Sequence, residues 1–157
     1  MSTRSESLAT KVEQSFKDLL VAVEASTPEQ WVARCADGEW TQGFAAFHVA
    51  SNIERITQMV RSVADGQPFP MITTQEIDAG NAEQAKEHAD CTKAETIDLI
   101  KNSAPAAATT VRSLSDAQLD RKVKLMESWP EVTVEMFAQM GLAGHAAAHI
   151  TTITGAR

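Results

Sequence analysis

Residues 133–154 read TVEMFAQMGLAGHAAAHITTIT, and the fold is best inferred outward from this stretch. Apolar and small residues recur there at intervals of three and four, which is typical of a helix with one face against a core. No charged residue occurs from position 141 to position 156. Because solvent-facing helix turns normally carry Lys or Glu, we expect this segment to be buried. The predicted core stripe comprises Val134, Ala138, Gly141, His145, Ala148 and Thr152.

Three further segments have the same spacing of apolar residues and complete a bundle. The second predicted helix follows Thr41, a plausible N-cap. The third is interrupted near Thr92, where Glu95 has capping-box spacing and allows a new helical start. With only 5 Pro and 7 Gly, the chain lacks the breakers that a fold of many strands and turns needs. We therefore predict an all-α, antiparallel four-helix bundle with a broken third helix and long connections. Its helices cover residues 7–25, 42–64, 76–103 and 133–154.

The connections carry weaker signals. Pro105 predicts a kink, or a short further helix to about residue 114. Ser115 and Gln118 have the spacing of another capping box. Residues 119–131 read as irregular or weakly extended chain.

Length, charge and cysteine use narrow the class of protein. A chain of 157 residues suits a single domain covering 1–157. The net charge is −7 without a basic stripe, so we expect no nucleic-acid partner. Cys35 and Cys91 stand alone, the N-terminus has no apolar leader, and no apolar run approaches the ~20 residues that span a bilayer. These features predict a cytoplasmic protein without disulfides or membrane contact.

Two histidines in the last predicted helix form the motif H-x-x-x-H. His145 and His149 lie one helical turn apart, with Cβ atoms about 6 Å apart, so both rings can reach one cation. Buried neutral histidines need partners for both ring nitrogens. A metal ion supplies one such partner, and hydrogen bonds to backbone or hydroxyl groups are the alternative.

A third histidine favours the metal. His48 lies on the second predicted helix amid apolar residues, and facing helices of a bundle direct side chains to one interior point. Three neutral imidazoles leave a divalent ion its full charge and an open fourth position, as in catalytic zinc sites. We therefore predict a metal site formed by His48, His145 and His149. His88 lies among charged residues and is expected to be a solvated surface histidine.

With these motifs the chain resembles the DinB/YfiT-like superfamily of metal-binding four-helix bundles. The resemblance rests on Trp40 followed by His48, on residues 76–81 (EIDAGN), and on the closing H-x-x-x-H at His145 and His149. It covers nearly the whole chain and implies the three histidines as ligands of one divalent ion, Zn²⁺ or Ni²⁺.

The same resemblance implies several activities. Some members are similar to thiol-dependent transferases or isomerases that use mycothiol, bacillithiol or glutathione, so a low-molecular-weight thiol is an expected co-substrate. Others look like metal-dependent hydrolases, and a non-catalytic, stress-response binding protein is a further alternative. A small-molecule substrate and a homodimer are expected by analogy. No residue is assigned a catalytic role, and whether the chain is an enzyme stays open.

Several further residues could belong to the site, to the core or to the surface. Glu54 and Arg55 follow His48. They are general acid/base groups or supporting groups of the site, or they belong to a solvated face. Cys35 is expected to be a small buried thiol, with a nucleophile as the alternative. Trp31, Trp40 and Trp129 are expected to cap the core, with Trp40 or Trp129 at a pocket mouth as the alternative. Met136 and Met140 are expected in the core.

Overall fold

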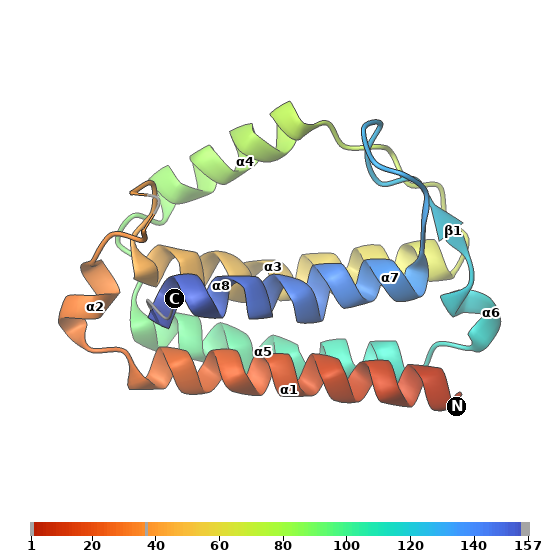
Figure 1. The fold of residues 1–157 in the computed structure, drawn as a ribbon, viewed down its shortest axis with the longest axis horizontal. Coiled ribbons are helices and arrows are strands. Elements are labelled where there is room, and N and C mark those ends of the chain that lie inside the picture. The colour runs from red at the N-terminus through yellow and green to blue at the C-terminus, as the bar shows by residue number, and fades with distance from the viewer. Residues whose placement is uncertain (1, 37, 155–157) are drawn as a thin grey trace.

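The computed structural model describes residues 2–36 and 38–154, and its architecture is an all-α bundle. Three of the bundle helices are α1 (Thr3–Ala25), α3 (Gln42–Ala64) and α5 (Lys93–Arg112). The fourth is the C-terminal helix, a continuous helix made of α7 (Val134–Ala138), η1 (Gln139–Gly144) and α8 (His145–Thr154). Helix α5 packs against α1 and α3, and α8 also packs against α1 and α3 (Figure 1).

Small elements close the ends of the bundle. A two-stranded antiparallel sheet pairs Lys122 with Thr133 and Val123 with Val132. Residues 119–131 were predicted to be irregular or weakly extended, and of them Lys122 and Val123 form a strand, whereas Leu119 ends a short helix. The remaining short elements are α2 (Pro28–Val32), α6 (Asp116–Leu119), β1 (Lys122–Val123) and β2 (Val132–Thr133).

Side-chain caps set the helix boundaries. The side chain of Thr41 accepts from the backbone of Phe44 at the start of α3. Thr92 and Ser115 form complete capping boxes at the starts of α5 and α6. These three predictions are confirmed. Each cap satisfies backbone N–H groups that the first helical turn leaves without partners.

The prediction of a separate short helix after Pro105 is wrong. Helix α5 continues through this residue to Arg112. Proline removes one backbone hydrogen bond within a helix. On both sides of Pro105, the buried residues Ile100, Ala107 and Val111 hold α5 against the core and offset that loss.

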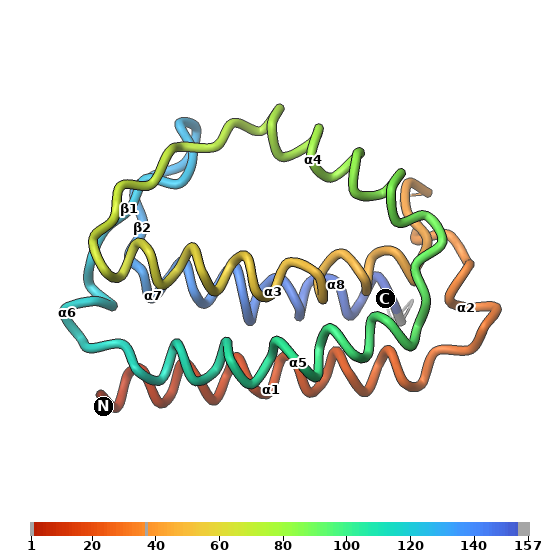
Figure 2. The backbone as a smooth tube through the Cα atoms, turned by 180° about the vertical axis from the view of Figure 1, so that it is seen from behind, coloured from red at the N-terminus to blue at the C-terminus, as the bar shows by residue number. Residues whose placement is uncertain are grey.

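The third predicted helix is two helices with different roles. Helix α4 (Thr74–Glu87) carries the chain back over the bundle, and α5 then runs in the same direction as α3 (Figures 1 and 2). The predicted break at Thr92 is confirmed, but only α5 joins the packed bundle. Helix α4 has no buried residue. Its one large apolar side chain, Ile77, cannot supply a core-facing stripe.

The C-terminal helix contains a π-helical turn that the regular spacing did not predict. Residues Gln139–Gly144 form η1, whose wider turn shifts the following residues around the helix axis. Ala148 is exposed, and Ala146 and Ile153 are buried instead. The predicted stripe is therefore wrong at Ala148, whereas His145 and Thr152 beyond the π turn are partly buried.

Met136 and Met140 are not core residues. Their side chains are 50% and 41% exposed. The core face of α7 is formed by Val134, Phe137 and Ala138, and Met136 points away from it. Of the two glycines in η1, Gly141 allows close packing against α3, because a β-carbon there would lie 3.0 Å from Ile56 Cγ2.

Across the described ranges, no helix combines the length and apolar character needed to cross a bilayer. The longest helices are α1 and α3. Helix α3 is buried at every residue from 43 to 50, but its C-terminal half and the whole of α1 present one apolar face to the bundle and a polar face to the outside. This is the pattern of helices that pack side by side around a shared core.

Gly43 is a sensitive packing position where α3 meets α2. A β-carbon there would overlap the Trp31 indole, which is held in place because its Nε1 donates to the carbonyl of Cys91 at 2.9 Å. We predict that Gly43→Ala lowers the free energy of unfolding by about 1–3 kcal/mol. Gly80→Ala is the control, because no atom lies within 4 Å and alanine favours helix. Urea denaturation measures both, and a wild-type midpoint for Gly43→Ala would contradict the packing described.

Candidate metal centre

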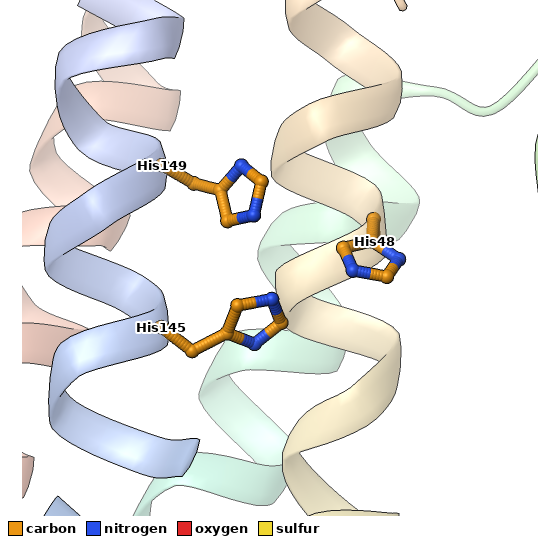
Figure 3. A group of neighbouring side chains, drawn as sticks. All are labelled: His48, His145 and His149. Atoms are coloured by element: carbon orange, nitrogen blue, oxygen red, sulfur yellow. The ribbon is translucent and has the colours of Figure 1, made fainter. Parts of the chain in front are cut away.

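The structure brings together the three histidines that the sequence singled out. His145 and His149 project from consecutive turns of α8 toward α3, which carries His48 (Figure 3). One ligand nitrogen from each ring lies within 4.8 Å of the other two. Nitrogens around a tetrahedral zinc ion are about 3.4 Å apart, so the rings have to close by about 1 Å on binding. The three residues could hold a metal ion.

The orientation of His48 is fixed by helix α4. Its Nδ1 donates to Oε1 of Gln84 at 2.8 Å, and Nε2 of Gln84 donates to the Ser51 hydroxyl at 2.8 Å. The hydrogen therefore resides on Nδ1, and Nε2 of His48 keeps its lone pair. Metal-binding histidines commonly have this arrangement, in which one nitrogen donates to an oxygen and the other is left for the ion.

The environment keeps the imidazoles of His48 and His145 neutral. Burial lowers the pKa of His48, and burial together with repulsion from His48 and His149 lowers the pKa of His145 to about 3. Neutral imidazole is the form that coordinates a metal, because a protonated ring has no free lone pair. Both rings are therefore ready to act as ligands at neutral pH.

Aromatic rings cover one side of the triad. The Trp40 ring lies 4.9 Å from the His48 ring and is stacked over His149 at 6.2 Å, measured between centroids. Phe44 packs edge-on against Trp40 at 4.9 Å. Trp40 thus shields the histidines from solvent, which goes beyond its expected role of capping the core.

The other side of the triad opens into a cavity of about 710 Å³ between α3 and α4. His48 and His145 line it, together with Asn52 and Arg55. Arg55 Nε donates to Asn52 Oδ1, and Asn52 Nδ2 donates to the His48 carbonyl. Trp129 also lines the cavity. This agrees with the alternative prediction, in which it lies at a pocket rather than capping the core. A cavity of this size is typical of small-molecule sites.

Other candidate residues lie away from the triad. Cys35 is buried as expected, and Glu54 lies outside the lining of this cavity. His88 is half-buried against Phe47, with ring centroids 4.6 Å apart, so the expectation of a fully solvated histidine is wrong. The end of α4 rests on α3 at that contact, which explains its burial.

A family model described as the DinB superfamily matches residues 11–153. The chain belongs to the DinB superfamily. No curated protein and no solved structure matches this DinB chain. The match begins within α1 and covers the rest of the bundle, including α4 and all three histidines, and it confirms the resemblance inferred from the sequence motifs.

One DinB-like motif has a different role from the one expected. Residues 76–81 do not open a bundle helix. They form the first turns of α4, where Glu76 completes a capping box with Thr73 and both Gly80 and Asn81 line the cavity. The motif therefore shapes the wall opposite the histidines.

The roles of Gln84 and Asn52 at the site were not predicted from the sequence. An isolated glutamine in a polar helix gives no signal of its function, because its contact with His48 spans 36 positions of the chain. Asn52 did offer a signal, since it stands one helical turn after His48 on α3.

Proposed function

We propose that this protein is a metal-dependent enzyme in which His48, His145 and His149 bind one zinc or nickel ion. The observation that supports it most is the convergence of ring nitrogens from three histidines, two of which line the wall of a large cavity. No carboxylate or thiolate of the described residues joins this group. Three protein ligands beside a cavity are the arrangement of catalytic rather than structural zinc sites.

A divalent ion held in this way lowers the pKa of a bound thiol or water and so supplies a nucleophile at neutral pH. The residues of the chain do the remaining work. His48 is oriented by Gln84, Trp40 excludes solvent from one side, and the cavity admits the substrate from the other.

The nucleophile has to come from outside the chain. Cys35 is 4% exposed and does not line the cavity. Burial, with Glu95 and Asp90 nearby, raises the pKa of the Cys91 thiol to about 11, and that side chain also lies outside the cavity lining. A low-molecular-weight thiol attacking a small electrophile is therefore our first choice of reaction, and attack by water is the second.

The reaction is tested with the metal-loaded protein and a model electrophile, with mycothiol, bacillithiol, glutathione or no thiol. We expect thiol consumption above the uncatalysed rate, abolished by a chelator and by His145→Ala. His88→Ala is the control and should retain full activity. Turnover without any thiol would favour hydrolysis instead. A chelator-insensitive rate would contradict a metal-dependent enzyme.

Gln84 provides a second test, through metal affinity alone. We predict that Gln84→Leu weakens metal binding about 10- to 100-fold, because His48 loses the acceptor that fixes its tautomer and orientation. Gln84→Glu keeps an acceptor oxygen and should bind at least as tightly as wild type. Gln14→Leu, on the exposed side of α1, is the matched control. Competition with a chromophoric chelator measures all four proteins, and equal affinity for Gln84→Leu and wild type would remove Gln84 from the site.

A homodimer in the cytoplasm is part of the same proposal. Met136 and Met140 stand four residues apart on the C-terminal helix with half-exposed side chains, which supports an apolar contact face there. Light scattering tests this, and a monomer at all concentrations would remove the dimer.

A further inference from the structure

The cavity beside the histidines changes character along its length. Its polar end is formed by His48 and His145 with Asn52 and Arg55. Along α3 the lining then becomes apolar at Met59, eleven residues and about 16 Å beyond His48. The apolar end is completed by Phe69, Ile72, Leu125, Met126, Trp129 and Phe137.

Arg55 is the only lysine or arginine among the residues that line this cavity. Its Nε donates to Asn52, and the described residues include no carboxylate that forms an ion pair with it. By contrast, Arg4, Arg61 and Arg112 are all ion-paired. The planar guanidinium of Arg55 therefore keeps donors available for a carboxylate from outside the chain.

Three carboxylates, those of Glu76, Glu83 and Glu87, line the opposite wall on α4. Glu76 is engaged in its capping box with Thr73, and Glu83 and Glu87 are exposed to solvent, which screens their charge. Burial is the main cause of the lowered pKa of His48 and His145, and the charge of Arg55 contributes to both. Arg55 is therefore the cation that lies beside the histidines in this cavity, and a bound divalent ion would add to its positive charge.

We propose that the cavity binds a small amphiphilic monocarboxylate, with its carboxylate at Arg55 beside the histidines and its apolar chain against Met59, Phe69 and Trp129. This assignment rests on the metal site proposed above, because it names the substrate class of the same cavity. The apolar end buries the chain by the hydrophobic effect, and Arg55 selects the head group. The carboxylate end thereby lies next to the position where an ion would act.

The test compares three probes with the same chain: decanoate, decanol and decyltrimethylammonium. Calorimetry on chelator-treated protein keeps direct coordination out of the measurement. We expect decanoate to bind about tenfold or more tightly than either other probe, as a charge-assisted hydrogen bond requires. Arg55→Gln should remove this preference, whereas Arg34→Gln, which removes the same charge outside the cavity, should retain it.

The apolar end is tested with Ile77→Glu, which places a charge in the cavity wall from the exposed helix α4. It should weaken decanoate and decanol alike, and Val21→Glu, on the exposed side of α1, should weaken neither. Trp129 fluorescence should shift when decanoate binds and stay constant with acetate. Melting curves confirm that each variant is folded.

Equal affinity for decanoate and decanol, or a preference that survives Arg55→Gln, would overturn this inference. Metal content of the same preparations separates it from the proposed function. A bound ion without carboxylate preference would overturn only the ligand class. A preference for the carboxylate in a protein that binds no metal would overturn the proposed enzyme. The cavity would then still be assigned to a carboxylate ligand.

Discussion

A chelator is expected to lower the melting temperature of the metal-loaded wild-type protein by about 10 °C. An ion that binds only the folded state stabilises it by about 3–4 kcal/mol when its concentration is 100 to 1,000 times the dissociation constant. For a chain of this size, each kcal/mol corresponds to a few degrees. Differential scanning calorimetry with and without chelator measures the shift.

The histidine variants determine whether this stabilisation comes from the proposed site. His48→Ala, His145→Ala and His149→Ala should each melt at one temperature irrespective of the chelator, because two imidazoles hold the ion far more weakly than three. His88→Ala should keep the full chelator shift, since its ring contacts Phe47 rather than the triad. A chelator shift that persists in all three variants would place the ion elsewhere.

Acid is expected to destabilise the metal-free protein more steeply between pH 6.5 and 5 than its carboxylates alone explain. Burial, and repulsion from the other two histidines, lowers the pKa of His145 to about 3, and burial lowers that of His48. In the unfolded chain both return to about 6.5. The unfolded state therefore binds more protons in this window, so stability is complete above pH 6.5 and decreases as the pH falls toward 3.

The slope for one such histidine approaches ~1.4 kcal/mol per pH unit. Urea denaturation at several pH values measures it on chelator-treated protein. His145→Gln should flatten the slope, because glutamine does not titrate, and His88→Gln should leave it unchanged. A pH-independent free energy of unfolding between pH 6.5 and 5 would show that His145 protonates freely in the folded state.

Local signals in the sequence were sufficient for most of the fold. Thr41, Thr92 and Ser115 mark helix starts through contacts only three residues long, so their caps could be predicted and are confirmed. The three histidines could also be grouped, because helical spacing places His145 and His149 together and a bundle brings a facing helix to them.

The failures concern properties that depend on distant contacts. The exclusion of α4 from the bundle is the exception, because the absence of an apolar stripe in residues 74–87, where Ile77 is the one large apolar residue, is visible in the sequence. The π turn in η1 displaces Ala148 from the core, yet nothing in the spacing of residues 133–154 marks it. Gln84 acquires its role only because α4 crosses back over α3.

The number of metal ions per chain tests the central claim most directly. It should be measured by elemental analysis on protein purified without added metal and without a histidine tag, and again after loading with zinc or nickel. We predict one ion per chain for wild type and His88→Ala, and none retained by His48→Ala, His145→Ala or His149→Ala. Full occupancy in His48→Ala, with loss in the other two, would contradict a site shared between α3 and α8.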